Sequence, residues 1–317
     1  MRTCNKAGWR TCVGEASRRN CMPAPITIDA DKCKKDGLCV RVCPWVFEQA
    51  DKATVPTVAF PGDCILCGHC VAVCSTGALT LHLMDMENFP PIDTAEALAP
   101  ETLHHLLRMR RSVRQYKSEP VPRERLEALL DAARYAPTGH NARNLRYIVV
   151  QDPGLIHGLS AVIVHKMQRD LKRADDPDAL AALDPGEASR LKRVRPDYQV
   201  MVSAWEKGED PILYHAPVLV VIHAPRKTPT PVEDATLAAS HLMLMAEACG
   251  LGTCLIGWFY HAASRDEAIR ERLGIPPTDD VYMAITLGYP AVRFHRLVDR
   301  PKPAIHWMEP AGDSANR

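Results

Sequence analysis

The stretch CILCGHCVAVC, residues 64–74, decides the fold of the N-terminal region. Its cysteines are spaced C-x₂-C-x₂-C-x₃-C, the run that holds an iron–sulfur cubane. The short gaps wrap a loop around the cubane so that three thiolates converge on it, and the fourth cysteine points toward another cluster. A zinc site would instead need four ligands in two separated pairs. We therefore predict cluster ligands at Cys64, Cys67, Cys70 and Cys74.

A second stretch, CKKDGLCVRVCP at residues 33–44, repeats this spacing with one exchange, because Asp36 stands in a cysteine position. In two-cluster proteins the last cysteine of each run ligates the other cluster. This rule predicts two sites. The four-cysteine site consists of Cys43, Cys64, Cys67 and Cys70. The Asp36 site consists of Cys33, Asp36, Cys39 and Cys74.

Asp36 has three interpretations. Its carboxylate ligates the fourth iron of a [4Fe–4S] cluster, or it faces solvent beside a [3Fe–4S] cluster, or the site is empty. The empty site is disfavoured because Cys74 would lose its partners although every other ligand position is kept. We favour ligation. A carboxylate suits iron less well than a thiolate does, so we expect that iron to be labile.

Composition limits the class of protein. The 317 residues favour about two domains, and the net charge of +1 gives no basic field for nucleic acid or an anionic membrane. The longest apolar run, at residues 216–222, is too short to span a bilayer. Disulfide frameworks belong to small secreted chains, and this chain shows no secretory signal. We therefore expect a cytoplasmic protein whose 12 cysteines serve mainly metal.

The chain divides by composition into four zones. Residues 1–21 are basic and lack an apolar segment, so we predict a disordered or mis-assigned leader, with Met22 as the start. Residues 22–85 form the cysteine-rich domain, bracketed by strands at 26–29 and 78–83. Residues 86–102 are a Pro- and Ala-containing linker. Residues 103–317 form a larger α+β domain.

Apolar periodicity predicts the elements of this larger domain. Residues 123–137 form a helix with Leu126, Leu129, Leu130 and Ala133 on one face, ended by Pro137. Residues 155–211 are a charged, mostly helical insertion. Residues 232–252 contain a helix that stops at Gly250. The predicted buried strands are LRYIVVQDP (145–153) and PVLVVIHA (217–224), and further apolar strand-like runs are TCLIGWFY (253–260) and VYMAITLGY (281–289).

The segment RRSVRQY, residues 110–116, combines three arginines and a serine. Guanidinium groups fit phosphate oxygens bidentately, although such a segment is also typical of a solvated basic face. It is followed in order by APTGHNARNLRYIVV, GLGTCLIGWF and LGYPAVRFHRLVDRPKPAIHW. In this order the segments resemble the nitroreductase family of FMN enzymes over nearly all of residues 103–307. Residues 25–85 resemble a two-cluster bacterial ferredoxin domain, so the expected fold is α+β in both domains.

The resemblance implies a flavin site and a homodimer whose active sites lie at the subunit interface. In the family, one loop reaches the flavin from the other subunit, and here it matches Pro137, Thr138, Gly139 and Asn141. The other implied FMN contacts are Arg110, Arg111, Ser112, Arg114, Leu255, Ile256, Gly257, Arg296 and Arg300.

Several further residues have default interpretations. GLGTCL lacks the last glycine of a dinucleotide fingerprint, and it follows a helix and precedes a strand, the reverse of that motif. We expect Cys249 and Cys254 to be buried rather than reactive. In the family the region matching 155–211 covers the flavin pocket. Candidates to line the pocket are Tyr198, Trp205 and Tyr214.

Together these patterns predict an FMN-dependent oxidoreductase. An external low-potential donor, a ferredoxin or similar, loads two iron–sulfur clusters that pass electrons toward FMN. The reduced flavin then acts on an organic acceptor of the nitro, quinone or activated alkene class. No side chain stands out as a catalytic acid or base, so solvent or a pocket tyrosine supplies protons. The alternative is a redox or oxygen sensor, or an electron-transfer flavoprotein, without small-molecule turnover.

Overall fold

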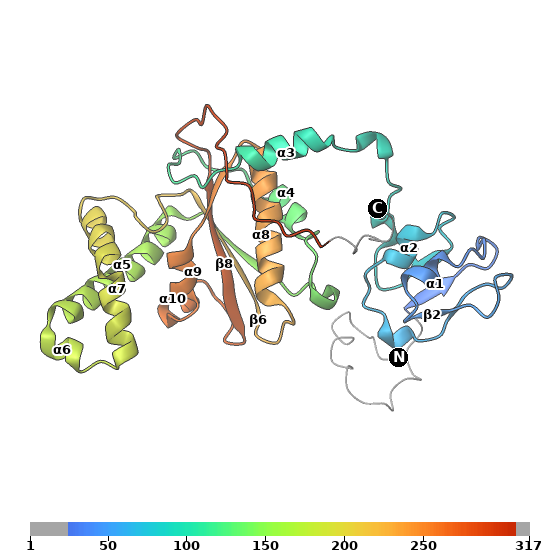
Figure 1. The fold of residues 1–317 in the computed structure, drawn as a ribbon, viewed down its shortest axis with the longest axis horizontal. Helices are drawn as coiled ribbons and strands as arrows, with labels where there is room; N and C mark the ends of the chain where they lie inside the picture. Colours follow the sequence, from blue (N-terminus) through green and yellow to red (C-terminus); the bar gives the residue numbers. More distant parts are fainter. Residues whose placement is uncertain (1–24, 309–317) are drawn as a thin grey trace, which may run out of the picture. The chain divides into compact units, whose positions relative to one another are not determined.

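The computed structural model describes residues 25–308, so the predicted leader lies outside the described residues (Figure 1). The chain forms two compact units. The N-terminal unit holds the residues up to Ala97 together with segments 137–144 and 226–234. The larger unit holds residues 98–136, 145–225 and those from Ala235 onward. Two short segments from the larger predicted domain therefore pack with the cysteine-rich region.

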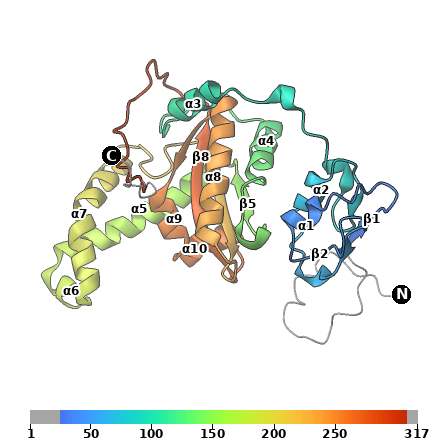
Figure 2. The same ribbon diagram turned by 45° about the vertical axis from the view of Figure 1, so that its right-hand side comes forward.

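The N-terminal unit is built from short elements around a small core. The predicted strands at 26–29 and 78–83 are confirmed as β1 (Ile26–Ile28) and β4 (Leu79–Leu81), which pair antiparallel. Two short helices, α1 (Leu38–Val42) and α2 (His69–Val73), lie side by side in this unit (Figure 2). A second small sheet pairs β2 (Phe47–Glu48) with β3 (Thr57–Val58). The core contains Ile26, Phe47, Leu79 and Leu81 together with the cysteines.

The larger unit contains an antiparallel sheet of order β5-β6-β8-β7. Its strands are β5 (Arg146–Val150), β6 (Val218–Pro225), β8 (Asp279–Gly288) and β7 (Gly252–Leu255). Seven consecutive residues of β6 are buried, which confirms the predicted buried strand at 217–224. A strand buried on both faces reads as a continuous apolar run, and VLVVI is such a run.

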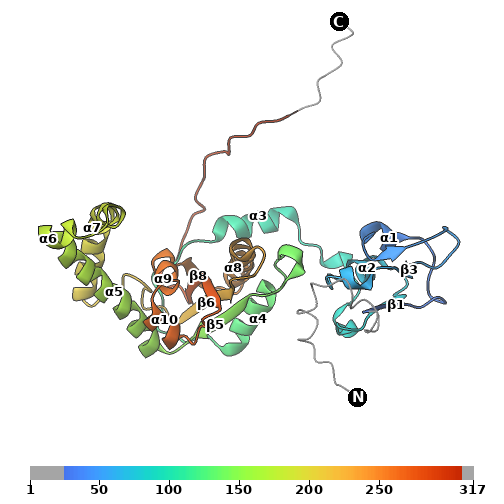
Figure 3. The same ribbon diagram turned by 90° about the horizontal axis from the view of Figure 1, so that it is seen from below.

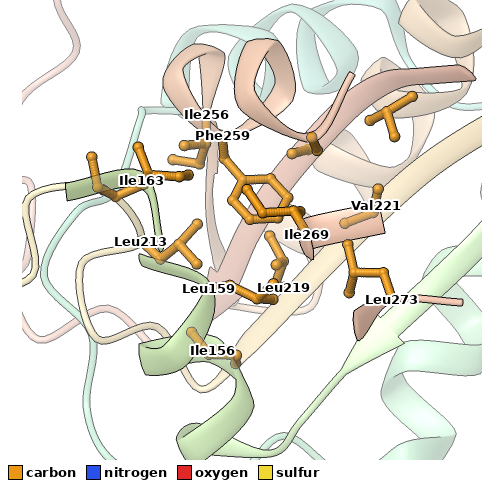
Figure 4. Packing of buried hydrophobic residues seen from close by; sticks show 14 of the residues in the cluster. Ile156, Leu159, Ile163, Leu213, Leu219, Val221, Ile256, Phe259, Ile269 and Leu273 are labelled. Atoms are coloured by element: carbon orange, nitrogen blue, oxygen red, sulfur yellow. The ribbon is translucent and has the colours of Figure 1, made fainter. Parts of the chain in front are cut away.

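Helices cover both faces of this sheet (Figure 3). On one face, α4 (Arg123–Ala133) and α8 (Pro231–Ala248) pack against Val218, Val220 and Ile222 of β6. On the other face, Leu219 and Val221 pack against α5 (Pro153–Asp175), α9 (Gly257–Ala263) and α10 (Glu267–Arg272). Figure 4 shows this second core, with the fully buried ring of Phe259 among aliphatic side chains.

The predicted helical insertion is confirmed. Helix α5 continues through α6 (Pro177–Ala181) into α7 (Pro185–Glu206), and α5 and α7 pack along each other. Asp152, Asp176 and Asp184 each accept backbone N–H hydrogen bonds at a helix N-terminus, and proline occupies the first position of all three helices. None of the described helices is long and apolar enough to cross a membrane.

Three sequence predictions are wrong in detail. The strand at 145–153 is half-buried rather than buried, because β5 lies at the edge of the sheet. Helix α4 ends at Ala133, before Pro137, because only Arg134 still donates to the carbonyl four residues back, whereas Tyr135 and Ala136 donate to carbonyls three residues back. The run TCLIGWFY divides into β7 and helix α9, since Gly257 begins a helix whose Phe259 and Ala263 face the core.

Truncating Phe259 tests the second core. Its ring is 0% exposed, so Phe259→Ala leaves a cavity, and we expect a loss of about 3–5 kcal/mol in the free energy of unfolding. Val200→Ala is the control, because Val200 is 71% exposed on α7 and its loss should change stability by less than about 0.5 kcal/mol. Urea denaturation followed by circular dichroism measures both. Equal effects would contradict the packing described.

Candidate functional site

The two cysteine loops share one backbone conformation. Lys35 and Leu66, each two residues after the first cysteine of its run, have φ of 61° and 54°. The glycines that follow the second ligand position, Gly37 and Gly68, have φ of 68° and 78° and begin α1 and α2. Only glycine adopts this left-handed conformation without steric cost. The loops are therefore folded alike, and Asp36 occupies the place that Cys67 has in the other loop.

Hydrogen bonds to the first cysteines repeat this likeness. The Sγ atoms of Cys33 and Cys64 each accept a backbone N–H from the residue two positions on, at 3.4 Å in both loops. The carboxylate of Asp36 likewise accepts the N–H of Leu38, at 3.1 Å. Hydrogen bonds to the ligand atoms tune the reduction potential of a bound cluster.

The thiols separate into two groups by electrostatic interaction. The thiol of Cys39 interacts with those of Cys33 and Cys74. The thiol of Cys70 interacts with those of Cys43, Cys64 and Cys67. Cys43 and Cys74 each lie at the end of a helix whose other cysteine belongs to the opposite group. This grouping agrees with the crossover predicted from the spacing.

Asp36 lies with the three thiols of its predicted site. One cavity is lined by Cys33, Asp36, Cys39 and Cys74, with Lys34 and Thr76 at its wall. Among residues 25–308, no three histidine, cysteine or acidic side chains gather tightly enough to hold one metal ion. A cubane requires less convergence, because its ligands bind different irons. The donor arrangement therefore fits a cluster better than a single zinc ion.

Burial controls the protonation of these thiols. It raises the pKa of Cys70 to about 12, and it also raises the pKa of Cys39, Cys43 and Cys64. Burial acts in the same direction on Cys74, but hydrogen bonds from Thr76, Ala78 and Gly77 outweigh it, and the pKa of Cys74 is lowered. Most of these ligands are thus protonated at neutral pH without a bound cation, so cluster binding must release protons.

The predicted arginine segment lies against strand β7. Ser112 pairs with Thr253 in parallel, and the N–H of Val113 donates to the Thr253 carbonyl at 3.0 Å. Gly252 permits this approach, because a Cβ there would lie 2.6 Å from the Val113 side chain. The backbone therefore fixes Arg110–Arg114, which follow helix α3 (Pro100–Met109), beside the sheet.

Arg111 and Arg296 line one cavity of about 550 Å³ in the larger unit. Its wall also carries Lys117, Arg293 and Glu247. Among the described residues, the buried Nε of Arg111 has no hydrogen-bond partner. The Nη1 of Arg111 donates to the carbonyls of Arg108 and Arg110, at 2.6 and 2.8 Å, so the backbone holds this guanidinium in place. The arginines and the lysine that line the cavity fit an anionic ligand. Lys117, Arg293 and Glu247 were not predicted as site residues, because a single charged residue outside a motif gives no signal in the sequence.

Arg114 belongs to a different group of side chains. Its guanidinium lies 5.8 Å from the centroid of the Tyr214 ring and interacts with the buried thiol of Cys254. Tyr116 completes the group, donating its hydroxyl to the Val113 carbonyl at 2.6 Å. Cys254 is 2% exposed, which confirms the prediction of a buried thiol, and burial raises its pKa. Cys249 is half-buried against the core formed by α4 and α8.

The remaining predicted site residues are spread over the structure. Leu255 ends β7 with its side chain 44% exposed, Ile256 is buried, and Gly257 begins α9. Arg300 is exposed in the C-terminal segment and is not among the residues lining the cavity of Arg111. Tyr198 packs against Trp258, and Trp205 stacks on His157.

The predicted loop Pro137–Asn141 belongs to the N-terminal unit. Its Asn141 amide donates to the carbonyl of Ile65 at 2.9 Å and to that of Leu66 at 3.0 Å. The N–H of Gly139 donates to Asp234 Oδ1 at 3.0 Å and to the hydroxyl of Thr230 at 3.1 Å. The loop is thus held against the cysteine run at 64–74.

Comparison with known proteins follows the same two-part division. A model of a 4Fe-4S dicluster domain matches residues 25–75, and the nitroreductase family model matches residues 107–289. An "NADH dehydrogenase" of Thermus thermophilus is 28% identical over 206 residues, covering 57% of this chain and 83% of that protein. An "Iodotyrosine deiodinase" of Thermotoga neapolitana is 28% identical over 151 residues, covering 48% of this chain and 71% of that protein.

Solved structures include a nitroreductase with bound FMN from Bacteroides fragilis. It is 24% identical, with a TM-score of 0.48, and the match covers 66% of this chain and 100% of that one. The family match confirms the predicted α+β fold and the class of flavin oxidoreductase. Because the matched residues 107–289 make up more than half of the chain, the chain belongs to the nitroreductase family, with a 4Fe-4S dicluster domain preceding its nitroreductase domain.

Proposed function

We propose that this chain is an FMN-dependent oxidoreductase that receives electrons through two iron–sulfur clusters and reduces an organic acceptor. The observation that carries the proposal is the joint presence of two separate ligand groups and a cationic cavity on one nitroreductase-family chain. The acceptor class is nitro compounds, quinones or activated alkenes. Halogenated tyrosine belongs in the same panel, because a relative bears the name iodotyrosine deiodinase.

The residues around the cavity fit the phosphate end of FMN. Arg111, Arg296, Lys117 and Arg293 line the cavity and supply positive charge that fits a phosphate group. Glu247 lines the same cavity, where burial raises the pKa of its carboxyl and the charges of Arg110 and Arg111 offset only part of that rise. When bound, FMN exchanges one or two electrons, or a hydride, with an organic molecule. The chain itself binds, orients and shields the flavin.

Two ligand groups would hold the clusters. The four-cysteine site supplies four thiolates, and the Asp36 site supplies three thiolates and a carboxylate. Because Asp36 occupies the backbone place of a cysteine and lines the same cavity as its partners, we favour its carboxylate as the fourth ligand. Clusters shuttle single electrons, which suits an external low-potential donor, a ferredoxin or similar.

A homodimer fits the apolar side chains that the described surface leaves exposed. Leu103 and Leu107 on α3 are 43% and 50% exposed, and Leu237 and Met245 on α8 are 41% and 36% exposed. Exposed apolar side chains on a helix favour an interaction surface when they gather on one patch. We propose that a second copy of the chain covers them, as expected from the family resemblance.

The route of the electrons is tested by stopped-flow reduction of the flavin. We expect rapid reduction by a reduced ferredoxin-type donor, and slow reduction by the same donor in Cys64→Ser/Cys67→Ser, because that variant lacks one complete cluster site. NADH is the comparison reductant for both proteins. Fast flavin reduction by NADH in the variant would contradict the proposed donor. Absence of turnover with every acceptor in the panel would favour the sensor.

Arg111→Ala tests the phosphate site. Loss of a charge-assisted hydrogen bond costs about 1.5–3 kcal/mol, so FMN affinity should fall roughly tenfold to a hundredfold. Arg123→Ala is the matched control, because the Arg123 side chain is 83% exposed on α4, pairs with Glu127 and does not line the cavity. Titration of flavin-free protein with FMN, followed by fluorescence quenching, measures both. An unchanged affinity in Arg111→Ala would place the phosphate elsewhere.

Asp36→Cys tests the carboxylate ligand. A fourth thiolate should make the cluster resistant to loss of iron in air and should change its anaerobic EPR spectrum. Asp51→Cys is the matched control, because Asp51 likewise accepts a backbone N–H two residues on, at 3.1 Å, and does not line the cavity. Identical spectra and air stability in the wild type and Asp36→Cys would show that Asp36 is not a ligand.

A further inference from the structure

The side chain of Gln49 joins the loop that carries Asp36 to a β-hairpin of the same unit. Its Nε2 donates to the carbonyl of Lys35 at 3.1 Å and to the carbonyl of Thr54 at 2.8 Å. A side-chain amide has two N–H donors, so these contacts account for both. Its Oε1 lies against the residue after Asp36, since a Cβ at Gly37 would be 2.6 Å from that oxygen. One side chain therefore contacts the residues on both sides of Asp36.

Lys35 needs this support because of its backbone conformation. It has a φ of 61°, which costs energy in a residue with a side chain and persists only where the surrounding structure determines it. Its N–H donates to Cys33 Sγ at 3.4 Å, and its carbonyl accepts the Gln49 amide. Both backbone hydrogen-bonding groups of Lys35 are therefore fixed, and the peptide group that leads into Asp36 is held in one orientation.

The hairpin gives Gln49 a rigid base. Gln49 directly follows β2, whose Phe47 is 1% exposed in the core of the unit. Thr54 lies between β2 and β3, where its hydroxyl and its N–H both donate to the Asp51 carbonyl, at 2.7 and 3.0 Å. The Gln49 amide is thus held between a structured turn and the loop of Asp36.

The other cluster loop has a contact of the same kind. Leu66 corresponds to Lys35, because each precedes the second ligand position of its run and has a left-handed backbone. The carbonyl of Leu66 accepts the Asn141 amide at 3.0 Å. Both loops thus bind this carbonyl with a side-chain amide, although the two amides come from segments far apart in the sequence. The repetition favours a role in placing the residue that follows, which is Asp36 in one loop and Cys67 in the other.

We infer that Gln49 is a positioning residue for Asp36 and determines how firmly the Asp36 site keeps its fourth iron. The inference rests on the proposed function, in which the Asp36 carboxylate is the fourth ligand. The N–H of Leu38 donates to Asp36 Oδ1 at 3.1 Å, and engagement of one carboxylate oxygen leaves Oδ2 to bind iron. An oxygen ligand suits iron less well than a thiolate, so its placement has a larger effect on whether the iron is kept.

The change that Gln49 opposes is the loss of one ferrous ion. In a [4Fe–4S]²⁺ cluster at this site, the fourth iron is bound by inorganic sulfides and, as proposed, by the Asp36 carboxylate. When these bonds break, Fe²⁺ passes to water or to a chelator and leaves [3Fe–4S]⁰. Transfer of one electron to dioxygen then gives [3Fe–4S]⁺ and superoxide. The oxidised three-iron cluster is paramagnetic, so EPR detects it.

The test uses the full chain with both clusters reconstituted anaerobically, in the variants Gln49→Ala and Gln49→Glu. Glutamate keeps the length of the side chain but its carboxylate lacks N–H donors, so its oxygens would face the carbonyls of Lys35 and Thr54. Residues that hold a metal ligand in place contribute about tenfold to a hundredfold to metal affinity. We therefore expect both variants to lose ferrous iron to a chelator at least about tenfold faster than the wild type, and to gain the three-iron EPR signal in air. Gln151→Ala is the matched control, because the Gln151 amide likewise donates to a backbone carbonyl, that of Val121 at 2.9 Å, in the larger unit.

Asp36→Ala separates positioning of the ligand from a general role in folding. If Gln49 acts through the carboxylate, Gln49→Ala should cause no further loss of iron in the Asp36→Ala background. A further loss in that background would overturn the inference, as would an equal loss of iron from the four-cysteine site, measured by its own EPR signal. If Asp36→Ala itself keeps the fourth iron, the proposed ligation fails. Wild-type retention of iron in Gln49→Ala, with loss in Asp36→Ala, would overturn the inference and leave the proposed ligation standing.

Discussion

Burial of strand β6 on both faces is the constraint on which the larger unit depends. Its side chains alternate between two cores, so Val220 and Ile222 hold α4 and α8, while Leu219 and Val221 hold α5 and α9. Strand β8 pairs with β6 along its length and carries β7 on its other edge. Strand β7 in turn supplies the Thr253 carbonyl that anchors Val113. The position of the arginine segment therefore follows from the packing of a strand that carries no functional residue.

A different constraint governs the N-terminal unit, which has only a small apolar core. Its loops are determined by left-handed turns at Gly37 and Gly68 and by N–H groups directed at Cys33, Asp36 and Cys64. Burial raises the pKa of Cys39, Cys43, Cys64 and Cys70, so these thiols must lose their protons when a cluster binds. Cluster binding and the stability of this unit are thus linked, because a cluster that binds the folded loops and not the unfolded chain stabilises the folded state.

The sequence predicted the strands β1, β4, β6 and β8 and the two groups of cysteines, because both depend on local spacing. Prediction from the sequence failed where packing between distant segments determines the secondary structure or the lining of a cavity. The apolar run at 253–260 predicts one strand. In the structure, Phe259 lies instead in helix α9, where its ring packs in the core with residues of α5. The cavity of Arg111 is lined by residues that lie far apart in the chain, among them Lys117 and Glu247. No sequence motif predicts their place in its lining.

Asn141 shows how one residue can satisfy two interpretations at once. Its place in the sequence indicates a flavin loop, and its side chain is bound to the cysteine run at 64–74. Segment 137–144 packs within the N-terminal unit, although α4 and β5, which flank it in the sequence, belong to the larger unit. A chain that needed only to attach a ferredoxin-like domain would be served by its linker. A loop with left-handed residues that is held by a buried carboxylate is a costly structure, and the two hydrogen bonds that Asn141 donates to the cysteine run give a reason for keeping it.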